Sequence, residues 1–500
     1  SPTATTTYYV RYEADCGTTT CTSTTVTLKT ASVAPTSAAA SPAAICPSGS
    51  STLTYSGGSL GTGAVAKWYT GSCGGSLVGT GNSVSVSPTA TTVYYVRYEG
   101  DCNTTSCAST TVTMSVVPAI SVHPASTATC AGSNATFGVT ATGTGLSYQW
   151  QLSTDGGAGW VNISAAGSGP VYSGWTTAAL GVSSTTVAHS GYKYRVVVSG
   201  ACEPSVTSNV ATLTVNALPA ITVQPVNQSV CAGGSTAFDV TATGAGLSYS
   251  WGVSTNGGVT WSTLANGGVY SGVSTAHLAI TGATAGMSGY QYRVTVSGTC
   301  SPSVTSNAVS LSVFTAPVLT SQPASSAICE GTSTTFGVTA TGTALTYQWQ
   351  SSPNGSTWTN ITGAGSAPVY SGWNSQTLGV NTVVAANNGL QYRVVVSGTC
   401  SPAVTSNVAS LTVYTAPSIT SQPAARTVCD ATATTFSVGA TGTGLTYQWQ
   451  VSTNGGSTWG SLLNLGVYSG VTTNTLAISS VSTAMNTYRY RVVIDRKSVE

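Results

Sequence analysis

Residues Leu345-Thr346-Tyr347-Gln348-Trp349-Gln350 and Gln391-Tyr392-Arg393-Val394-Val395-Val396 decide the fold, because apolar or aromatic residues alternate with polar ones along the first segment and from Gln391 to Val394 in the second. A period of two is that of a β-strand with one buried face. The Tyr-x-Trp and Tyr-Arg-Val elements recur along the chain in steps of about 100 residues, and the repeated tryptophans are Trp150, Trp251, Trp349 and Trp449. A nearly constant step predicts tandem domains and not one large core.

The composition excludes several classes of protein. Charged residues make up 5% of the chain, against roughly 25% in ordinary globular proteins. The net charge is +2 with no basic run, so we expect no nucleic-acid partner. No apolar run approaches the roughly 18 to 20 residues of a membrane helix, so direct membrane insertion is not expected. The abundance of Thr, Val and Tyr predicts an all-β protein.

Two types of repeat follow one another. The segment with Tyr8, Cys16 and Cys21 recurs 86 residues later, at Tyr94, Cys102 and Cys107, so we expect the chain to begin inside a domain, with any export signal upstream. Proline-containing linkers mark the later boundaries. The predicted segments are 1–33 (C-terminal part of a first-type domain), 34–117 (a complete first-type domain), and the second-type domains 118–217, 218–316, 317–416 and 417–500, the last of them truncated.

The second-type repeat resembles the immunoglobulin-like domains found in tandem in large secreted and cell-surface, adhesin-like proteins of Bacteroidota. The residues that carry the resemblance are the repeated tryptophan, as strand C, and stretches such as Leu278-Ala279-Ile280 followed by Gly289-Tyr290-Gln291-Tyr292-Arg293-Val294. The resemblance implies tandem immunoglobulin-like β-sandwich domains, arranged as beads on a string. It also implies a corner tyrosine at Tyr194, Tyr292, Tyr392 and Tyr490, and a valine in place of the second core cysteine at Val196, Val294, Val394 and Val492.

The thirteen cysteines favour disulfides formed in an oxidising compartment. Nearly constant separations of 72, 69 and 71 residues predict bridges inside each second-type domain, Cys130–Cys202, Cys231–Cys300 and Cys329–Cys400. In the first-type domain we favour Cys46–Cys102 and Cys73–Cys107, while a local Cys102–Cys107 bridge stays open. Cys16 and Cys21 would need partners before residue 1, and Cys429 would need one near Ser498.

The charged ending, residues 495–500, differs from the Ser-Gly-Thr-Cys-Ser-Pro of 397–402, so we expect it to be foreign to the native chain. A metal site is disfavoured, because no Cys-x-x-Cys occurs and the three histidines fall at non-equivalent places. No cofactor is expected.

One motif resembles the Asp-box of sialidases and other propellers, Ser153-Thr154-Asp155-Gly156-Gly157-Ala158-Gly159-Trp160, and it recurs in the other second-type domains. Its chemistry is that of a hairpin turn, in which the Asx side chain caps amides and the tryptophan fixes the turn to the sheet. The repeated arginines should point outward, either into solvent or over aromatic rings. Trp175 and Trp373 either contact a sugar or protein ligand or, the more favoured use, pack on the sandwich.

No set of catalytic residues repeats or converges, so we expect no enzyme. The sequence favours a monomeric rod at the cell surface, acting as stalk, spacer or adhesive filament of a larger protein, possible partners being surface glycans or proteins. The alternative is a carbohydrate- or protein-binding accessory array of a secreted exoenzyme. A catalytic fragment is the third option, although its residues cannot be named.

Overall fold

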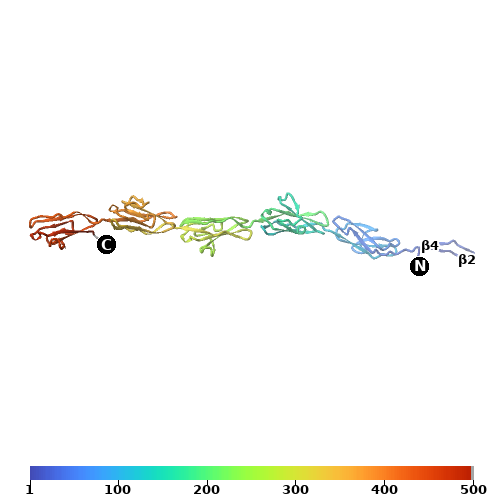
Figure 1. Cartoon of the computed structure of the whole chain (residues 1–500). Helices are drawn as coiled ribbons and strands as arrows, with labels where there is room; N and C mark the ends of the chain where they lie inside the picture. The colour runs from blue at the N-terminus through green and yellow to red at the C-terminus, as the bar shows by residue number, and fades with distance from the viewer. Residues whose placement is uncertain (497–500) are drawn as a thin grey trace. The chain divides into compact units, whose positions relative to one another are not determined.

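The computed structural model describes residues 1–496, and the regular secondary structure of this range is almost entirely β-strand (Figure 1). The four helices within these residues are single 3₁₀ turns of three residues each, η1 (Val187–His189), η2 (Ala285–Met287), η3 (Ala385–Asn387) and η4 (Thr483–Met485). The first strands, β1 (Thr6–Val10) and β4 (Thr22–Val26), pair with each other and carry the short hairpin β2 (Glu13–Ala14) and β3 (Gly17–Thr18) at their far end. Nearly all side chains of this segment are exposed.

The first-type sandwich has one sheet of three strands and one of five. The smaller sheet has the order β10 (Ser83–Val86), β7 (Ser51–Ser56), β5 (Ser37–Ser41), and the larger has the order β6 (Ala44–Ile45), β12 (Ala108–Met114), β11 (Thr92–Glu99), β8 (Val65–Thr70), β9 (Ser76–Thr80). The period of two places Leu53 from the first sheet against Trp68 and Val96 from the second, and all three are fully buried.

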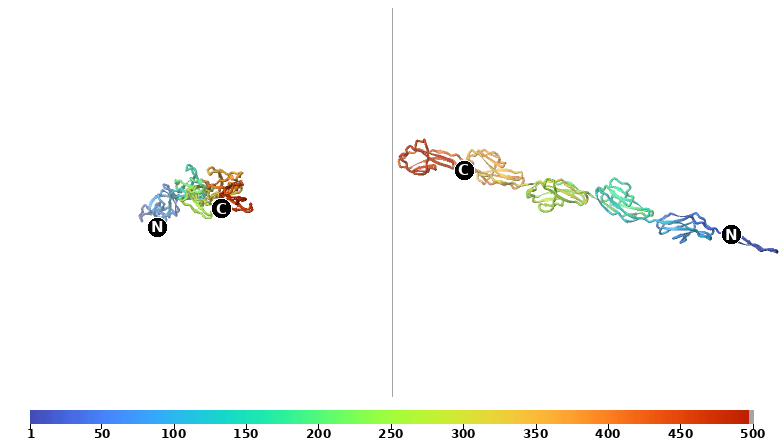
Figure 2. Two further views of the ribbon diagram at one scale, coloured as in Figure 1. Left: turned by 90° about the vertical axis from the view of Figure 1, so that its left-hand side faces the viewer. Right: turned by 90° about the horizontal axis from the view of Figure 1, so that it is seen from below.

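The second-type sandwich is represented by residues 119–216 (Figure 2). Its large sheet has the order β14 (Thr127–Cys130), β23 (Ala211–Asn216), β21 (Lys193–Ser199), β17 (Ser147–Ser153), β18 (Val161–Asn162), and β22 (Val206–Thr207) also pairs with β21. A three-stranded sheet has the order β15 (Ala135–Gly138), β20 (Ala179–Ser183), β19 (Val171–Ser173). A two-stranded sheet pairs β13 (Ala119–Val122) with β16 (Thr140–Thr142). Strand β14 runs parallel to β23, which places Cys130 opposite Asn216.

The core of this sandwich follows the sequence pattern. Trp150 lies opposite Val196 across β17 and β21, and both side chains are fully buried. A buried valine therefore does take the place of the second core cysteine. Tyr194 is also buried, and its hydroxyl lies 3.5 Å from that of Tyr172. Burial raises the pKa of Tyr194, so this phenol stays protonated and able to donate.

The next two sandwiches repeat the strand order of the second. Their large sheets are β25 (Gln228–Cys231), β34 (Val309–Phe314), β32 (Gln291–Ser297), β28 (Ser248–Ser254), β29 (Ser262–Thr263) and β36 (Ser326–Cys329), β45 (Ala409–Tyr414), β43 (Gln391–Ser397), β39 (Thr346–Ser352), β40 (Thr359–Asn360). Their small sheets are β26 (Thr236–Asp239), β31 (His277–Ile280), β30 (Tyr270–Ser271) and β37 (Thr334–Gly337), β42 (Thr377–Asn381), β41 (Val369–Ser371).

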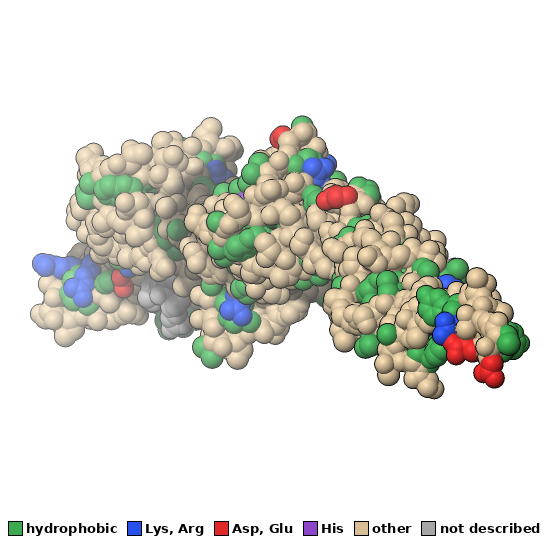
Figure 3. All heavy atoms as spheres, turned by 90° about the vertical axis from the view of Figure 1, so that its right-hand side faces the viewer, with side chains coloured by type: hydrophobic (Ala, Val, Ile, Leu, Met, Phe, Trp, Pro, Cys, Tyr) green, Lys and Arg blue, Asp and Glu red, His purple; other side chains and the backbone are tan. Residues whose placement is uncertain are grey.

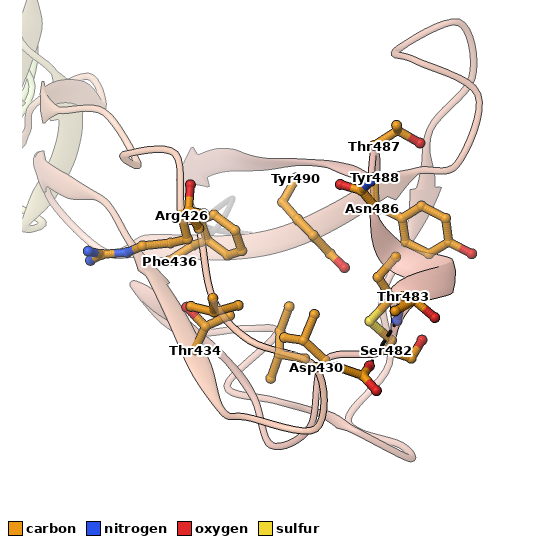
Figure 4. A pocket seen from close by; sticks show the side chains of 15 residues that line it. Arg426, Asp430, Thr434, Phe436, Ser482, Thr483, Asn486, Thr487, Tyr488 and Tyr490 are labelled. Carbon is orange, nitrogen blue, oxygen red and sulfur yellow. Dashed lines mark hydrogen bonds between the residues drawn. The ribbon is translucent and has the colours of Figure 1, made fainter.

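In the last sandwich the sheet equivalent to the large sheet of the other copies has only three strands, β50 (Gly460–Ser461), β49 (Leu445–Ser452) and β53 (Arg489–Arg496). The sheet that faces it contains β47 (Thr434–Ser437), β52 (Thr475–Ile478) and β51 (Tyr468–Ser469). Up to residue 496, no strand lies beside β53 where β23 lies beside β21. A pocket of about 360 Å³ occupies that side, with Phe436 and Tyr490 among its lining residues (Figure 4). Tyr490 is consequently only half-buried, whereas Tyr194 is fully buried.

Candidate functional site: disulfide joints and the arginine–tryptophan face

Three of the four disulfides join cysteines of consecutive sandwiches. The bridges are Cys46–Cys202, Cys130–Cys300 and Cys231–Cys400, with Cα–Cα distances of 5.6, 5.7 and 5.8 Å. They connect residues 156, 170 and 169 positions apart. The fourth bridge, Cys73–Cys107, lies inside the first-type sandwich and confirms the pairing favoured from the sequence.

The other predicted pairings, Cys130–Cys202, Cys231–Cys300, Cys329–Cys400 and Cys46–Cys102, are wrong, and the reason is strand direction. Cys130 ends a strand parallel to β23 and so lies at the end of the sandwich where β23 finishes. Cys202 follows β21, which runs antiparallel to β23, and therefore lies at the opposite end. The six residues of β23 alone span about 20 Å, far beyond the roughly 7 Å that a disulfide tolerates between Cα atoms.

The same geometry explains the pairings that form. Cys130 lies beside Asn216, the last residue of its sandwich, and the Sγ atom of Cys300 lies 3.7 Å from the carbonyl oxygen of Asn216. The turn that carries Cys300 thus contacts the end of the preceding strand β23. Cys202, Cys300 and Cys400 are each 2% exposed. Each of these three joints therefore has two covalent connections, the peptide linker and a disulfide with one buried and one partly buried cysteine.

Five cysteines are unpaired in the described structure: Cys16, Cys21, Cys102, Cys329 and Cys429. Cys329 ends β36 as Cys130 ends β14, and its Sγ accepts a hydrogen bond from Nη1 of Arg496 at 2.8 Å. The position predicted for a cysteine partner, Ser498, and most of the ending expected to be foreign lie outside the described residues.

A second repeated arrangement covers the outer face of the large sheets. The Cζ atom of Arg195 lies 4.2 Å from the ring centroid of Trp160, and the pairs Arg293–Trp261, Arg393–Trp358 and Arg491–Trp459 repeat this stacking at 4.2, 4.2 and 4.3 Å. The predicted packing of outward arginines over aromatic rings is confirmed. The Nε–H of Arg195 also donates to Oε1 of Gln151 at 2.7 Å. The stacked guanidinium is thus fixed in orientation.

The Asp-box supplies the tryptophan of each pair. Between β17 and β18, the Ser153 hydroxyl donates to Asp155 at 2.7 Å, and the Gly159 N–H donates to the same carboxylate at 2.9 Å. These two hydrogen bonds, the Gly159 one first, hold the pKa of Asp155 below its usual value. The box therefore closes a hairpin that presents Trp160 to Arg195, so its contribution is structural.

Trp175 and Trp373 are partly buried and pack against the cores of their own sandwiches. The Trp175 carbonyl oxygen also accepts from the Trp150 N–H at 3.0 Å. At the equivalent position, Val273 and Val471 are buried. Packing on the sandwich, the use favoured from the sequence, thus accounts for both rings, and a ligand contact by either stays a prediction.

Charges are sparse on the face drawn in Figure 3, where uncharged polar side chains and backbone dominate. One cluster of charged side chains lies on the first-type sandwich, around Glu99. Glu99 accepts hydrogen bonds from the Tyr69 hydroxyl, from Nζ of Lys67 at 2.9 Å and from Nε of Arg97 at 2.8 Å. The Tyr69 hydrogen bond, followed by those from Lys67 and Arg97, lowers the pKa of Glu99 to about 2.

No helix of residues 1–496 has the length and apolarity to cross a membrane. No three His, Cys, Asp or Glu side chains in this range lie close enough together to hold a metal ion.

The comparisons with known proteins give the following. Residues 33–118 match a family described as an Ig-like domain, CHU_C associated, and residues 120–217 and 319–415 each match a domain of unknown function. The comparison with curated proteins found no match. Similar solved structures include the I-band fragment I67-I69 from titin (18% identity, TM-score 0.44, covering 59% of this chain and 98% of that one) and Sidekick-1 immunoglobulin domains 1-5 (17%, 0.33, 90% and 95%). The sheet order and the Ig-like family model together make the chain a tandem array of immunoglobulin-like β-sandwiches.

Proposed function

We propose that this chain is a non-enzymatic, extracellular repeat region that acts as the stalk, spacer or adhesive filament of a larger surface protein, with joints held by disulfides. The observation that carries the proposal is the set of three bridges between consecutive sandwiches. Such bridges persist only in an oxidising compartment, which supports secretion or surface exposure. The domain limits given from the sequence, and a monomeric state, are part of the same proposal.

The physical reason concerns the linkers. A peptide linker of a few residues leaves two domains free to reorient, and small interdomain contacts do not prevent this. A second covalent connection at 5.7 Å between Cα atoms, as at Cys130–Cys300, ties two points of the joint together. The bridge restricts rotation about the linker, which favours a spacer that fixes the relative orientation of its domains as well as the distance between them.

Small-angle X-ray scattering tests this role. The variant with Cys46, Cys130 and Cys231 all replaced by serine removes the three joint bridges and leaves every sandwich its own core. We expect its pair-distance distribution to broaden relative to the oxidised parent chain. The matched control, with Cys73 and Cys107 replaced by serine, removes a bridge inside one sandwich and should scatter like the parent. Identical scattering of the triple variant and the parent would refute the proposed role of the joints.

A further inference from the structure

The arginine–tryptophan face of the second second-type sandwich, on residues 248–295, differs from its counterparts at two positions. The sandwiches before and after it carry two glutamines on the outer face of strand C, Gln149 and Gln151 in one and Gln348 and Gln350 in the other; the last has Gln448 and Gln450. In their place this sandwich has Ser250 and Gly252. This sandwich therefore lacks both glutamine side chains that the other three second-type sandwiches carry on this face.

In the other copies the second glutamine binds the arginine. Oε1 of Gln350 accepts from Nε of Arg393 at 2.7 Å, and Gln151 and Gln450 do the same for their arginines at 2.7 and 2.8 Å. Gly252 has no side chain to do so, yet Arg293 stacks on Trp261 at the same 4.2 Å. The guanidinium of Arg293 is therefore held by stacking, while the position that the glutamine Oε1 atom occupies in the other copies holds no side-chain oxygen of residue 252.

The first glutamine binds two backbone carbonyls. Nε2 of Gln348 donates to the carbonyl oxygens of Trp349 and Ile361, both at 3.0 Å. The corresponding carbonyls beside Ser250 are those of Trp251 and Leu264. The Trp251 carbonyl oxygen accepts from the Leu264 backbone N–H at 2.8 Å, and among the described residues no side chain donates to either carbonyl. The vacated space thus offers a cationic donor on one side and carbonyl acceptors on the other.

A pocket of about 140 Å³ occupies this space. Its lining includes Ser250, Gly252, Trp261, Thr263 and Arg293. In the described part of the chain no carboxylate forms a salt bridge with Arg293. The volume is below the roughly 300 Å³ at which drug-sized sites begin, so the pocket suits one chemical group or one sugar unit of a longer ligand.

We propose that this pocket, here named the Arg293 pocket, binds the carboxylate-bearing unit of an acidic polysaccharide, a uronic acid. The carboxylate takes the vacant acceptor position and pairs with the unneutralised guanidinium, whose planar donors match a carboxylate. The ring hydroxyls donate to the carbonyls that glutamine serves elsewhere, and accept from the serine and threonine hydroxyls. An acidic peptide side chain supplies the acceptor but none of the hydroxyl donors, which favours the sugar.

The test uses the full chain and tri-galacturonic acid as the probe, with binding measured by calorimetry and by saturation-transfer NMR. The parent chain should bind one trisaccharide weakly, in the millimolar range expected for a shallow site. The variant S250Q/G252Q restores the residues of the neighbouring copies and should weaken binding at least tenfold. It should fold normally, because a Cβ added at Gly252 meets its nearest neighbour, the Ser262 carbonyl oxygen, at 3.4 Å.

The reciprocal variant Q149S/Q151G should create a second site in the preceding sandwich and raise the stoichiometry from one to two. A neutral galactose trisaccharide should not bind. Three results overturn the proposal: no binding of tri-galacturonic acid to the parent, equal binding by S250Q/G252Q, or binding of a glutamate hexapeptide as tight as that of the sugar. None of them bears on the disulfide joints, so the proposed spacer function stands or fails separately.

Discussion

Replacing Cys130 or Cys300 with serine should destabilise two sandwiches at once. Cys130 is fixed opposite Asn216, so when only the following sandwich unfolds, the bridge closes a loop that runs from Asn216 to Cys300, 84 residues. The loop-entropy model gives about −15 cal/mol/K for that closure, or about 4.5 kcal/mol at 25 °C. The preceding sandwich is also closed by the bridge, through a loop of similar size between Cys130 and Asn216.

We therefore expect both single variants, Cys130→Ser and Cys300→Ser, to lower the free energy of unfolding of both sandwiches by about 4 to 5 kcal/mol. That is a large part of the roughly 5 to 15 kcal/mol that stabilises a typical domain. Hydrogen exchange followed by mass spectrometry in rising guanidinium reports each sandwich separately. The control Cys73→Ser should affect only the first-type sandwich, because its bridge is local.

The outcome that refutes this reasoning is specific. If the cysteines paired inside each sandwich, Cys130→Ser would destabilise only residues 119–216 and Cys300→Ser only the following sandwich. Separate effects of this kind would show that the bridges do not cross the joints. Equal effects of the two variants on both sandwiches would support the crossing.

Three further predictions concern other features. Glu99→Gln should remove a stability contribution of about 1 to 2 kcal/mol, after allowance for a side chain that is 22% exposed. Because folding lowers the pKa of Glu99 to about 2, this contribution is complete above about pH 4.5 and is lost as the pH falls towards 2. A stability difference between parent and variant, measured by urea unfolding, that stays constant over this pH range would contradict the prediction. Arg393→Ala should cost about 0.5 to 1 kcal/mol by removing the stacking on Trp358, whereas Arg393→Lys should cost less, and equal losses measured by denaturant unfolding would count against the cation–π contact. A peptide with the sequence of residues 407–414 should bind beside β53 and raise the melting temperature of the last sandwich, because β45 occupies the equivalent position beside β43 in the preceding sandwich. The control is the same peptide with aspartate at the Leu411 position. Equal shifts of the melting temperature with both peptides would exclude binding as an added strand.

The parts of the structure that depend on local alternation were predictable. Trp150, Tyr194 and Val196 are spaced so that a period of two buries all three, and they are buried. The disulfide pairing was not predictable from spacing. The first three second-type copies each carry one cysteine of each kind, so pairings inside a copy and between copies are equally regular along the sequence. Only the parallel pairing of β14 with β23 places Cys130 at the far end of its sandwich.

The Arg293 pocket left a signal in the sequence that alternation alone does not reveal. Ser250 and Gly252 fit a strand as well as glutamine does, and the change becomes informative once Arg293 and Trp261 are known to stack beside it. The hairpin motif at Ser153 pointed to a structural turn, and the structure shows one. The sequence alone did not show that Trp160 of this motif stacks with Arg195, because that contact depends on how β17 and β21 pair.

The three joint bridges overlap along the chain, and this changes how the protein would carry tension. The backbone from Cys46 to Cys400 contains 400 − 46 = 354 residues. A shorter covalent path crosses the Cys46–Cys202 bridge, follows the backbone from Cys202 to Cys231, which is 231 − 202 = 29 residues, and then crosses the Cys231–Cys400 bridge. At about 3.5 Å per residue, full extension is about 1,240 Å without the bridges and about 100 Å with them. That short path runs along β23, the linker and strands β24 (Ala220–Val223) and β25, so a pulling force is borne by backbone that is already extended. Between Cys46 and Cys400 the oxidised chain would reach its limit before a sandwich unfolds, and reduction would make the same segment extensible.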